Sequence, residues 1–370
     1  DFYSWSEFNS TWYNQKKDNS TANEFYTDNG VNFKKGRGYL VAYENEGSKK
    51  FVGTLNNGEI SYPLSCSTDG EFVVERYTGF NLLGNPYPSY IDWEAEGWTR
   101  DNLQLQTIWI YDDDVNNYIT YTLGGVATNG GSQYIAPCQA FFVKAASAGN
   151  FIMTNDIRTN EKSSFRKNDN ENIFKIKVNG ASGQDEIAVV KGDNDDVIKM
   201  FSLNDDAPSL YINKGVGDYS VVYIDDENTL PLSFEGGFAK YTISLSECGN
   251  AFDEIILEDR LTGEKVNLMT ESYSFIYNDN DRKDRFVLTF DNGQQTTDNS
   301  HFAYINNGEI IINDIDGNAQ IEIYDLMGRR VYENADAVSN VSTYGYSSGV
   351  YIIRKIDDKG IKTQKILLNN

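Results

Sequence analysis

At 370 residues the chain is too long for one ordinary β-sandwich, and a size of roughly 150 residues per domain predicts two to three domains. Its net charge of -23, from 55 acidic and 32 basic residues, argues against nucleic acid or an anionic membrane as a partner, because either would need a phosphate-neutralising surface. An aromatic content of 14% favours strands over helices, since aromatic side chains fit pleated, half-buried surfaces.

The cysteines and the chain start bear on cellular context. Cys66, Cys138 and Cys248 are odd in number and far apart, so they form neither a disulfide framework nor a short-spaced metal motif, and we expect buried free thiols. No run of about 18 apolar residues indicates a transmembrane segment. The chain opens on Asp1 without a leader-like region, which predicts a fragment of a longer exported protein.

Residues 1–160 contain short strand-like runs cut by turn residues, which predicts a jelly-roll-like domain. Tyr90–Asn102 holds Trp93 and Trp98 around Gly97, and we expect a turn or short helix there. The predicted strands are Gly38–Tyr43, Lys50–Leu55, Ile60–Leu64, Gly79–Leu83, Thr107–Tyr111, Tyr118–Tyr121 and Pro137–Lys144.

The polar stretch Thr154–Asn172 predicts a domain boundary, and a β-sandwich domain follows at residues 170–292. Alternating apolar residues such as Tyr241, Ile243 and Leu245 predict one buried and one exposed face per strand. The predicted strands are Ile173–Val178, Glu186–Val190, Leu210–Tyr211, Tyr219–Tyr223, Tyr241–Leu245, Ile255–Glu258, Lys265–Leu268, Tyr273–Tyr277 and Arg285–Phe290. Asp291–Ser300 reads as a second linker.

Residues 301–370 predict a third, small antiparallel β-sandwich. A unit of this size is near the lower limit for independent stability, so it needs a compact core or a neighbour. Its predicted strands are Glu309–Ile312, Gln320–Tyr324, Arg330–Glu333, Val350–Arg354 and Thr363–Leu368.

A motif in this last unit carries a family resemblance. Ile321–Val331 reads IEIYDLMGRRV, and a Gly-x-Tyr and a late Lys follow it. This order resembles the type IX secretion sorting domains of Bacteroidetes, at residues 305–370. The resemblance implies recognition by the outer-membrane export machinery, cleavage after passage, and a secreted or cell-surface location. The matching positions are Tyr324, Asp325, Gly328, Arg329, Gly349, Tyr351 and Lys365.

The motif also has a purely structural interpretation. Asp325 to Gly328 predicts a turn in which Gly328 takes a positive φ and Asp325 bonds backbone amides, while Ile321 and Ile323 face the core. On this interpretation the residues only build a hairpin.

A second resemblance involves Gly79–Trp93 (GFNLLGNPYPSYIDW), with Gly36–Val41, Phe51–Asn56 and Ile135–Val143. These segments look like a β-domain that often precedes sorting domains in Bacteroidetes surface proteins. Asn85 to Pro88 could suggest a ligand site, but proline restricts φ and removes donors, so we interpret the segment as a rigid corner.

Catalytic motifs are sparse. His301 is the only histidine, which excludes multi-histidine metal centres, HExxH zinc sites and the usual serine triads within this chain. A hydrolase with two carboxylates stays open, because two acidic residues could meet from anywhere in so acidic a chain. Because the common catalytic motifs are absent, we nevertheless expect no enzymatic activity.

Two binding hypotheses remain. Asp112, Asp113 and Asp114 are candidate ligands for Ca²⁺, as are the acidic runs at 193–196 and 314–318, although none has a full calcium-loop pattern and each could be a solvated turn. Exposed rings could stack on sugars, but rings that share a strand face could instead be core. The sugar-platform candidates are Trp93, Trp98, Trp109 and Tyr111.

The sequence thus predicts an all-β protein of three consecutive antiparallel β-sandwich or jelly-roll-like domains. We expect a non-enzymatic secreted or cell-surface protein whose first two domains serve adhesion or spacing, with a glycan or a host or extracellular protein as partner. The alternative is a carbohydrate-binding accessory region of a larger glycan-degrading enzyme or peptidase.

Overall fold

The fold is all-β, as the sequence predicted. In the computed structural model no α-helix occurs among the described residues, and the helical turns are η1 (Glu75–Tyr77) and η2 (Asn155–Ile157). None of the described helices is long and apolar enough to cross a membrane. The structure describes residues 2–15, 26–27, 30–31, 33–42, 52–67, 75–162, 171–278, 280–291, 302–306, 308–313, 319–325, 328–334, 338–357 and 360–368.

The chain forms two compact units, Asp1–Gly293 and Gln294–Asn370. We divide the first unit into a first lobe, residues 2–159, and a second lobe, residues 173–291. These limits follow the predicted domains 1–160 and 170–292, but the two lobes share a hydrophobic cluster, as described below. The division into three domains therefore stays a prediction.

The first lobe is built around a five-stranded sheet with the order β12-β11-β10-β14-β7. Its strands alternate in which side chains they bury, so both faces of the sheet are apolar. The sheet consists of β7 (Phe80–Gly84), β10 (Thr107–Asp112), β11 (Asn117–Thr122), β12 (Val126–Thr128) and β14 (Ala140–Lys144).

Small sheets complete the first lobe. One face of the five-stranded sheet packs against two of these small sheets, and together they enclose a core centred on Trp93, Phe141 and Phe151. The first of these sheets is β6 (Ile60–Leu64), β15 (Gly149–Met153) and β9 (Trp98–Thr99), and the second is β13 (Tyr134–Ile135), β8 (Tyr90–Asp92) and β16 (Arg158–Thr159). The N-terminal strands are β1 (Phe2–Ser6), β2 (Thr11–Asn14), β3 (Tyr26–Thr27), β4 (Gly30–Val31) and β5 (Leu40–Val41).

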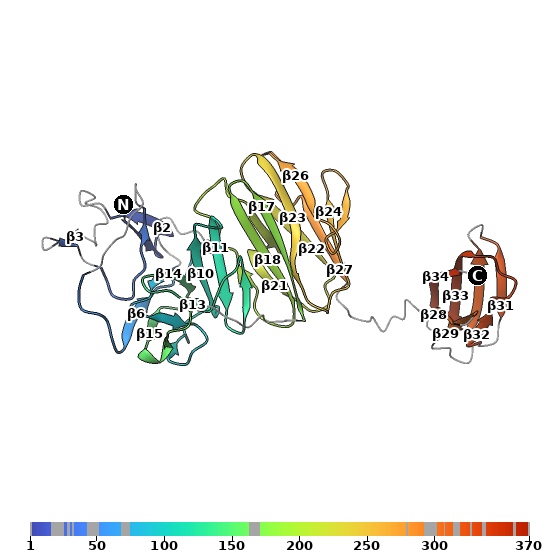
Figure 1. Ribbon diagram of the computed structural model, residues 1–370, viewed down its shortest axis with the longest axis horizontal. Coiled ribbons are helices and arrows are strands. Elements are labelled where there is room, and N and C mark those ends of the chain that lie inside the picture. The colour runs from blue at the N-terminus through green and yellow to red at the C-terminus, as the bar shows by residue number, and fades with distance from the viewer. Residues whose placement is uncertain are drawn as a thin grey trace. The chain divides into compact units, whose positions relative to one another are not determined.

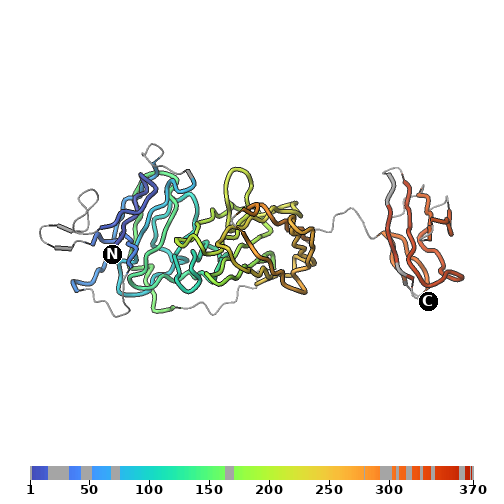
Figure 2. The backbone as a smooth tube through the Cα atoms, turned by 90° about the horizontal axis from the view of Figure 1, so that it is seen from above, coloured from blue at the N-terminus to red at the C-terminus, as the bar shows by residue number. Residues whose placement is uncertain are grey.

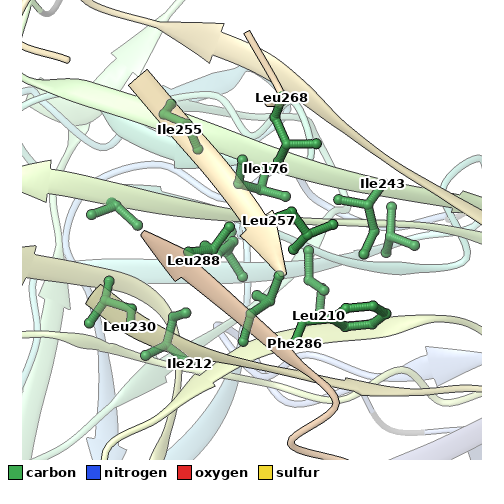
Figure 3. Close-up of a cluster of buried hydrophobic side chains, with 14 of the residues drawn as sticks. Ile176, Leu210, Ile212, Leu230, Ile243, Ile255, Leu257, Leu268, Phe286 and Leu288 are labelled. Atoms are coloured by element: carbon green, nitrogen blue, oxygen red, sulfur yellow. The ribbon is translucent and has the colours of Figure 1, made fainter. Parts of the chain in front are cut away.

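The second lobe is one long sheet path folded on itself, in the order β25-β24-β27-β22-β20-β21-β18-β17-β23-β26, with β19 beside β21. Its pairs are antiparallel except β18 with β21. Figure 3 shows apolar side chains of its strands pointing toward one another in the enclosed core. The strands are β17 (Ile173–Gly180), β18 (Gly183–Lys191), β19 (Val197–Ile198), β20 (Ser209–Asn213), β21 (Asp218–Ile224), β22 (Thr229–Glu235), β23 (Ala239–Cys248), β24 (Glu254–Asp259), β25 (Lys265–Asn267), β26 (Tyr273–Tyr277) and β27 (Phe286–Asp291).

The lobes meet through the remaining face of the five-stranded sheet. There Phe80, Trp109 and Phe142 pack in one cluster with Ala188 and Val221 of the second lobe. In Figure 1 β11 accordingly lies on the side of the first lobe that faces β18, and Figure 2 shows the two lobes in continuous contact. The N-terminal hairpin covers part of the same face, since the rings of Trp5 and Trp12 contact Phe142.

The second unit is a small sandwich. Its core gathers Ile310, Ile321, Ile323, Ile353 and other apolar residues between two sheets. One sheet is β28 (Ala303–Asn306), β29 (Glu309–Ile312) and β32 (Asn340–Ser342); the other, in the order β31-β30-β33-β34, is β30 (Gln320–Asp325), β31 (Arg330–Asn334), β33 (Gly349–Asp357) and β34 (Gly360–Leu368).

Some local predictions were wrong. Residues 52–55, expected in a strand, form none, and the rest of that predicted strand lies outside the described residues. The turn or short helix expected at residues 90–102 was confirmed as a turn, which lies between β8 and β9. In the predicted boundary, residues 154–159 belong to the first lobe, with Ile157 fully buried, while 163–170 lie outside the described residues, as do 292–300 of the second linker.

Candidate functional site

The predicted turn of the sorting motif forms in the second unit. Gly328 adopts a φ of +76°, and its backbone N–H donates to the carbonyl of Asp325 at 3.0 Å. The Asp325 carboxylate accepts from the backbone N–H of Arg329 at 2.9 Å and from its Nε at 2.7 Å. The turn therefore fixes the direction of the Arg329 side chain, which stays 79% exposed.

The other motif residues lie on the strands beside this turn. Tyr351 of β33 stands opposite Asp325 of β30, is buried, and donates its hydroxyl to the carbonyl of Ser347 at 3.0 Å. Gly349 begins the same strand. Lys365 of β34 is exposed, and register aligns it through Ile352 with Tyr324. The structure thus brings the seven motif positions, listed above from Tyr324 to Lys365, to three adjacent strands and one turn.

An ion-pair network next to the motif was missed by the sequence analysis. The Glu322 carboxylate accepts from Tyr324 Oη at 2.9 Å and from Arg330 Nη1 at 3.0 Å, and it forms an ion pair with Arg354 Nη1 at 3.2 Å. Arg330 also pairs with Glu333 at 3.0 Å. In the sequence, Glu322 and Tyr324 alternate with Ile321 and Ile323, which indicates that the two polar side chains share a face of the strand. That Arg330 and Arg354 lie beside them follows only from the register of the neighbouring strands.

Hydrogen bonding from Tyr324 and Arg330, together with the charge of Arg354, lowers the pKa of Glu322 below its usual range. The pKa of Arg330 is raised in turn, chiefly by its hydrogen bond to Glu322. Both groups are therefore charged throughout the physiological pH range, and the network holds two arginines in defined positions on a sheet surface.

Two of the sugar-platform candidates lie in the core of the first lobe. Trp93 is fully buried, stacks with Phe151 and donates Nε1 to the carbonyl of Gln106 at 3.0 Å. Trp98 packs against Trp93 with ring centroids 5.0 Å apart and donates Nε1 to the carbonyl of Asp92. Trp98 is partly buried, whereas Trp93 has no exposed ring face to offer a sugar.

The other two candidates lie at the junction between the lobes. Trp109 is fully buried and donates Nε1 to the carbonyl of Ile198 in the second lobe. Tyr111 is partly buried in the same cluster, and its hydroxyl donates to Asn116 Oδ1 at 2.6 Å. The expectation of a flat sugar platform is therefore wrong for Trp93 and Trp109, because both rings are fully buried and neither has an exposed face on which a sugar could stack.

The candidate Ca²⁺ ligands lie on the hairpin between β10 and β11. Asp112 Oδ1 accepts the backbone N–H of Asp114 at 2.8 Å, which is the hydrogen bond of an ordinary turn, and Asp113 lies between them. Among the described residues no three His, Cys, Asp or Glu side chains gather to hold a metal. Asp196 binds Lys214 and the N–H of Tyr223 instead. Residues 314–318 and His301 lie outside the described residues.

The cysteines and the predicted corner complete the sequence candidates. The three cysteines are free, but Cys138 is exposed and the other two are partly buried, so the expectation of buried thiols was wrong for Cys138. The corner after β7 is rigid for a further reason: Asn85 Nδ2 donates to three carbonyls, and Tyr87 is buried with its hydroxyl bonded to the carbonyls of Gly58 and Met153.

Comparison with known families gives two matches. Residues 1–290 match a family described as a domain of unknown function (DUF8693), and residues 305–369 match the secretion system C-terminal sorting domain. No curated protein and no solved structure gives a significant match. The first match extends across both lobes, in line with their shared cluster, and the second coincides with the described sandwich of the second unit.

Proposed function

Because the chain belongs to the DUF8693 family and ends in a type IX sorting domain, we propose that residues 1–293 form a rigid, non-enzymatic arm for adhesion or spacing. The sorting domain makes the protein a type IX secretion cargo of the Bacteroidetes kind, exported and attached at the cell surface. The resemblance and the location that the sequence predicted are thereby confirmed. What the arm does at the surface is the proposal.

The observation that carries the proposal is the buried junction between the lobes. Apolar residues of both lobes form one cluster there, with Trp109 and Ala188 fully buried. Sheets packed face to face in this way exclude water and move as one body, whereas lobes joined by a linker alone would move independently. A rigid extension is the property that a spacer or an adhesive stalk needs.

A polar network reinforces the junction. Asp185 and Lys199, both of the second lobe, form a fully buried ion pair, and Asn129 of the first lobe donates Nδ2 to Asp185 Oδ1 at 2.9 Å. The N–H of Asn129 also donates to Glu186 at 2.8 Å. Buried hydrogen bonds of this kind are directional, so they fix one orientation between the lobes.

A neighbouring set of contacts adds to the same orientation. Asn117, fully buried in the first lobe, donates Nδ2 to the carbonyl of Pro208 at 2.9 Å, and Asn116 donates to that of Ser182 at 2.7 Å. The N–H of Gln184 donates to the carbonyl of Val115 at 3.0 Å. Opening the junction would exchange these bonds for bonds to water, at a net cost of about 0.5–1.5 kcal/mol each.

Structural roles for the candidate residues favour an adhesive or spacing arm over a sugar-binding region. Trp93 and Trp109 fill cores, and Asp112 closes a turn. Trp98 packs against the core of the first lobe but is only partly buried, so part of its ring is exposed to solvent. Binding on a glycan array that Trp98→Ala abolishes would favour the carbohydrate-binding alternative.

Spin-label distances in the full chain test the arm directly. Val52 and Val216 are 87% and 91% exposed, one in each lobe, and suit labelling through Val52→Cys and Val216→Cys with the native cysteines replaced by serine. We expect one narrow distance distribution, broadened when Trp109→Ala and Asn129→Ala open the junction. A broad distribution in the otherwise native chain would contradict a rigid arm. Loss of cell adhesion in a strain that lacks residues 1–293 tests the role at the surface.

A further inference from the structure

We infer that the export receptor reads one particular surface of the sorting domain, the outer face of the sheet β31-β30-β33-β34, and that the matching receptor surface is acidic. The inference deepens the export role that the sorting domain carries. The outer face consists of two rows of side chains across the four strands, Arg330, Tyr324, Ile352 and Lys365 in one row and Glu333, Glu322, Arg354 and Thr363 in the next.

The register of the strands defines this face. Residues directly opposite one another in antiparallel strands project to the same side, and residues two apart on one strand do so as well. Arg330 and Glu333 are three apart and still share the face, because the pairing of β30 with β31 shifts register between Ile323 and Tyr324. The intervening residues, Ile321, Ile323 and Ile353 among them, are fully buried in the core. The sheet therefore has one face against the core and the outer face away from it.

Two of the motif positions identified from the sequence meet on this face. Tyr324 and Lys365 are far apart in the chain, yet both align with Ile352 of β33 in one row. A hairpin that needed only to fold would require neither a lysine at the exposed position 365 nor a tyrosine at the half-buried position 324. Their convergence on one surface is the pattern expected of a recognition site.

The charge distribution identifies the partner's chemistry. Of the charged residues, residues 294–370 contain seven basic and ten acidic side chains, so this unit carries -3 of the total of -23 and residues 1–293 carry -20. Three of those basic side chains, Arg330, Arg354 and Lys365, project from the outer face. With Glu322 and Glu333 counted, the eight residues of the outer face carry +1, against -3 for the whole unit. A slightly cationic surface on an otherwise acidic cargo favours an acidic partner, since complementary charge speeds and orients docking.

The arginines are held in place before any partner binds. Glu322 is 8% exposed and binds both Arg330 and Arg354, while the arginine side chains remain 45% and 34% exposed. The Arg354 guanidinium also lies 5.9 Å from the ring centre of Tyr324. Donors fixed in this way lose less conformational entropy on binding, so they suit directional contacts to carboxylates.

An acidic protein fits this face better than an anionic membrane. Membrane recognition by charge uses clusters of about four to eight Lys and Arg. Here the three basic side chains alternate with Ile352 and Tyr324 and with two glutamates, Glu322 and Glu333. Mixed apolar and arginine-rich surfaces are typical of protein interfaces.

Charge reversal in the host tests the assignment. We expect Arg330→Glu with Arg354→Glu, in the full-length protein, to lower surface display on the order of tenfold and to trap the protein in the periplasm. Arg330→Lys with Arg354→Lys should restore most of the display. Tyr344→Ser is the matched control, since Tyr344 is 97% exposed and lies outside the outer face.

A folding defect is separated from a docking defect by a milder variant. Arg330→Gln with Arg354→Gln keeps hydrogen-bond donors but removes the charge, and Lys365→Glu changes an exposed position. Melting curves of the purified full chains identify the variants that fold. Display at the wild-type level by folded variants of both kinds would overturn the inference, whereas wild-type display after deletion of residues 320–370 would overturn the export role itself.

Two binding measurements separate the possible partners. We expect the full chain to bind open outer-membrane fragments of the host, which expose their periplasmic face, less so at higher NaCl concentration, and the arginine variants to bind weakly. Equal binding to protein-free liposomes of the same lipids would assign the face to the membrane instead. Salt-dependent self-association that the arginine variants lose, seen by sedimentation, would assign it to a second copy. Either result would overturn an acidic receptor surface.

Discussion

Trp109 in the first lobe donates its indole N–H to the backbone carbonyl of Ile198 in the second lobe at 3.1 Å. The ring also packs edge-on against Phe80 with centroids 5.0 Å apart. One side chain therefore takes part in both the apolar and the polar contacts of the junction. The unfolding of the two lobes should be coupled through it.

Truncating this residue should destabilise both lobes together. We expect Trp109→Ala to lower the free energy of unfolding by about 3–5 kcal/mol, because a fully buried ring leaves a cavity. Trp109→Phe keeps much of the ring and loses the hydrogen bond, so it should cost about 1–3 kcal/mol. Chemical denaturation followed by fluorescence measures both, with Val52→Ala as the exposed control. Separate transitions for the two lobes in the native protein would contradict a shared core.

The buried pair Asp185 and Lys199 makes a second prediction. Asp185 also accepts the N–H of Leu210 at 2.7 Å and an amide proton of Asn129. Lys199→Met leaves this carboxylate buried without its cation, and we expect a loss of about 3–5 kcal/mol. Asp185→Asn with Lys199→Met should cost less than the sum of the single changes, as measured in a double-mutant cycle. Additive losses would show that the two charges do not interact.

The second lobe should lose stability in acid through Asp259. Burial would raise the pKa of this carboxyl, but hydrogen bonds from Arg285 and Tyr273 outweigh it and hold the pKa below its usual range. Because the folded pKa is lowered, the stabilisation is present above the unfolded pKa of about 3.9 and is lost as the pH falls through the folded value.

In Asp259→Asn the free energy of unfolding should therefore fall less steeply as the pH drops below about 4 than it does in the native protein. Arg285→Ala should cost about 3–5 kcal/mol at neutral pH, since it strands a buried carboxylate. Urea denaturation across an acidic pH series checks both variants. An unchanged acid limb in Asp259→Asn would show that other carboxylates cause the acid sensitivity.

Lys144 predicts a further rise of stability with pH, in the alkaline range. Its Nζ donates to the carbonyl of Thr78 and lies 4.6 Å from the ring centre of Phe80, and burial lowers its pKa to about 8 from 10.5. Between these values the unfolded chain holds more protons than the folded one, so the stability contribution of this group should rise with pH. The rise should be at most about 3 kcal/mol, and Lys144→Met should abolish it. Denaturation of both proteins from neutral pH to about pH 10 measures the difference.

Sequence patterns predicted strands that alternate in burial as well as strands buried on both faces, such as β10, and missed others, such as β15 and β22. Tyr273–Tyr277 and Ile60–Leu64 were assigned with the bounds that the structure has. β22 contains a proline, Pro231, that pairs with Val287 inside the sheet, although a proline within a run argues against a central strand. The local sequence pattern thus predicts most strands, whereas tertiary packing decides where a strand forms against the local preference.

At the candidate site, likewise, the sequence predicted the local features but not the contacts between strands. The turn at Gly328 follows from its residue types, whereas the Glu322 network depends on register between strands that the sequence does not specify. Trp109 and Tyr111 were known to share a strand face. That the face packs against the second lobe follows only from long-range contacts such as the bond to Ile198.

A matched pair of glycine substitutions separates recognition of the sorting motif from its folding. Gly328 and Gly345 have φ of +76° and +88°, and a Cβ would meet no atom within 4 Å at either. Strain in the left-handed conformation alone should therefore make Gly328→Ala and Gly345→Ala cost about 1–2 kcal/mol each. Gly328→Asn should cost less, since asparagine tolerates this conformation.

Thermal unfolding measures these costs, and surface display in the host measures export. If the turn that orients Arg329 is read during export, Gly328→Ala should reduce display more than Gly345→Ala at equal stability, and Gly328→Asn should restore part of it. Equal display of the two alanine variants would instead mean that the turn serves only to fold the hairpin, because strain of the same size would then have the same effect at both positions.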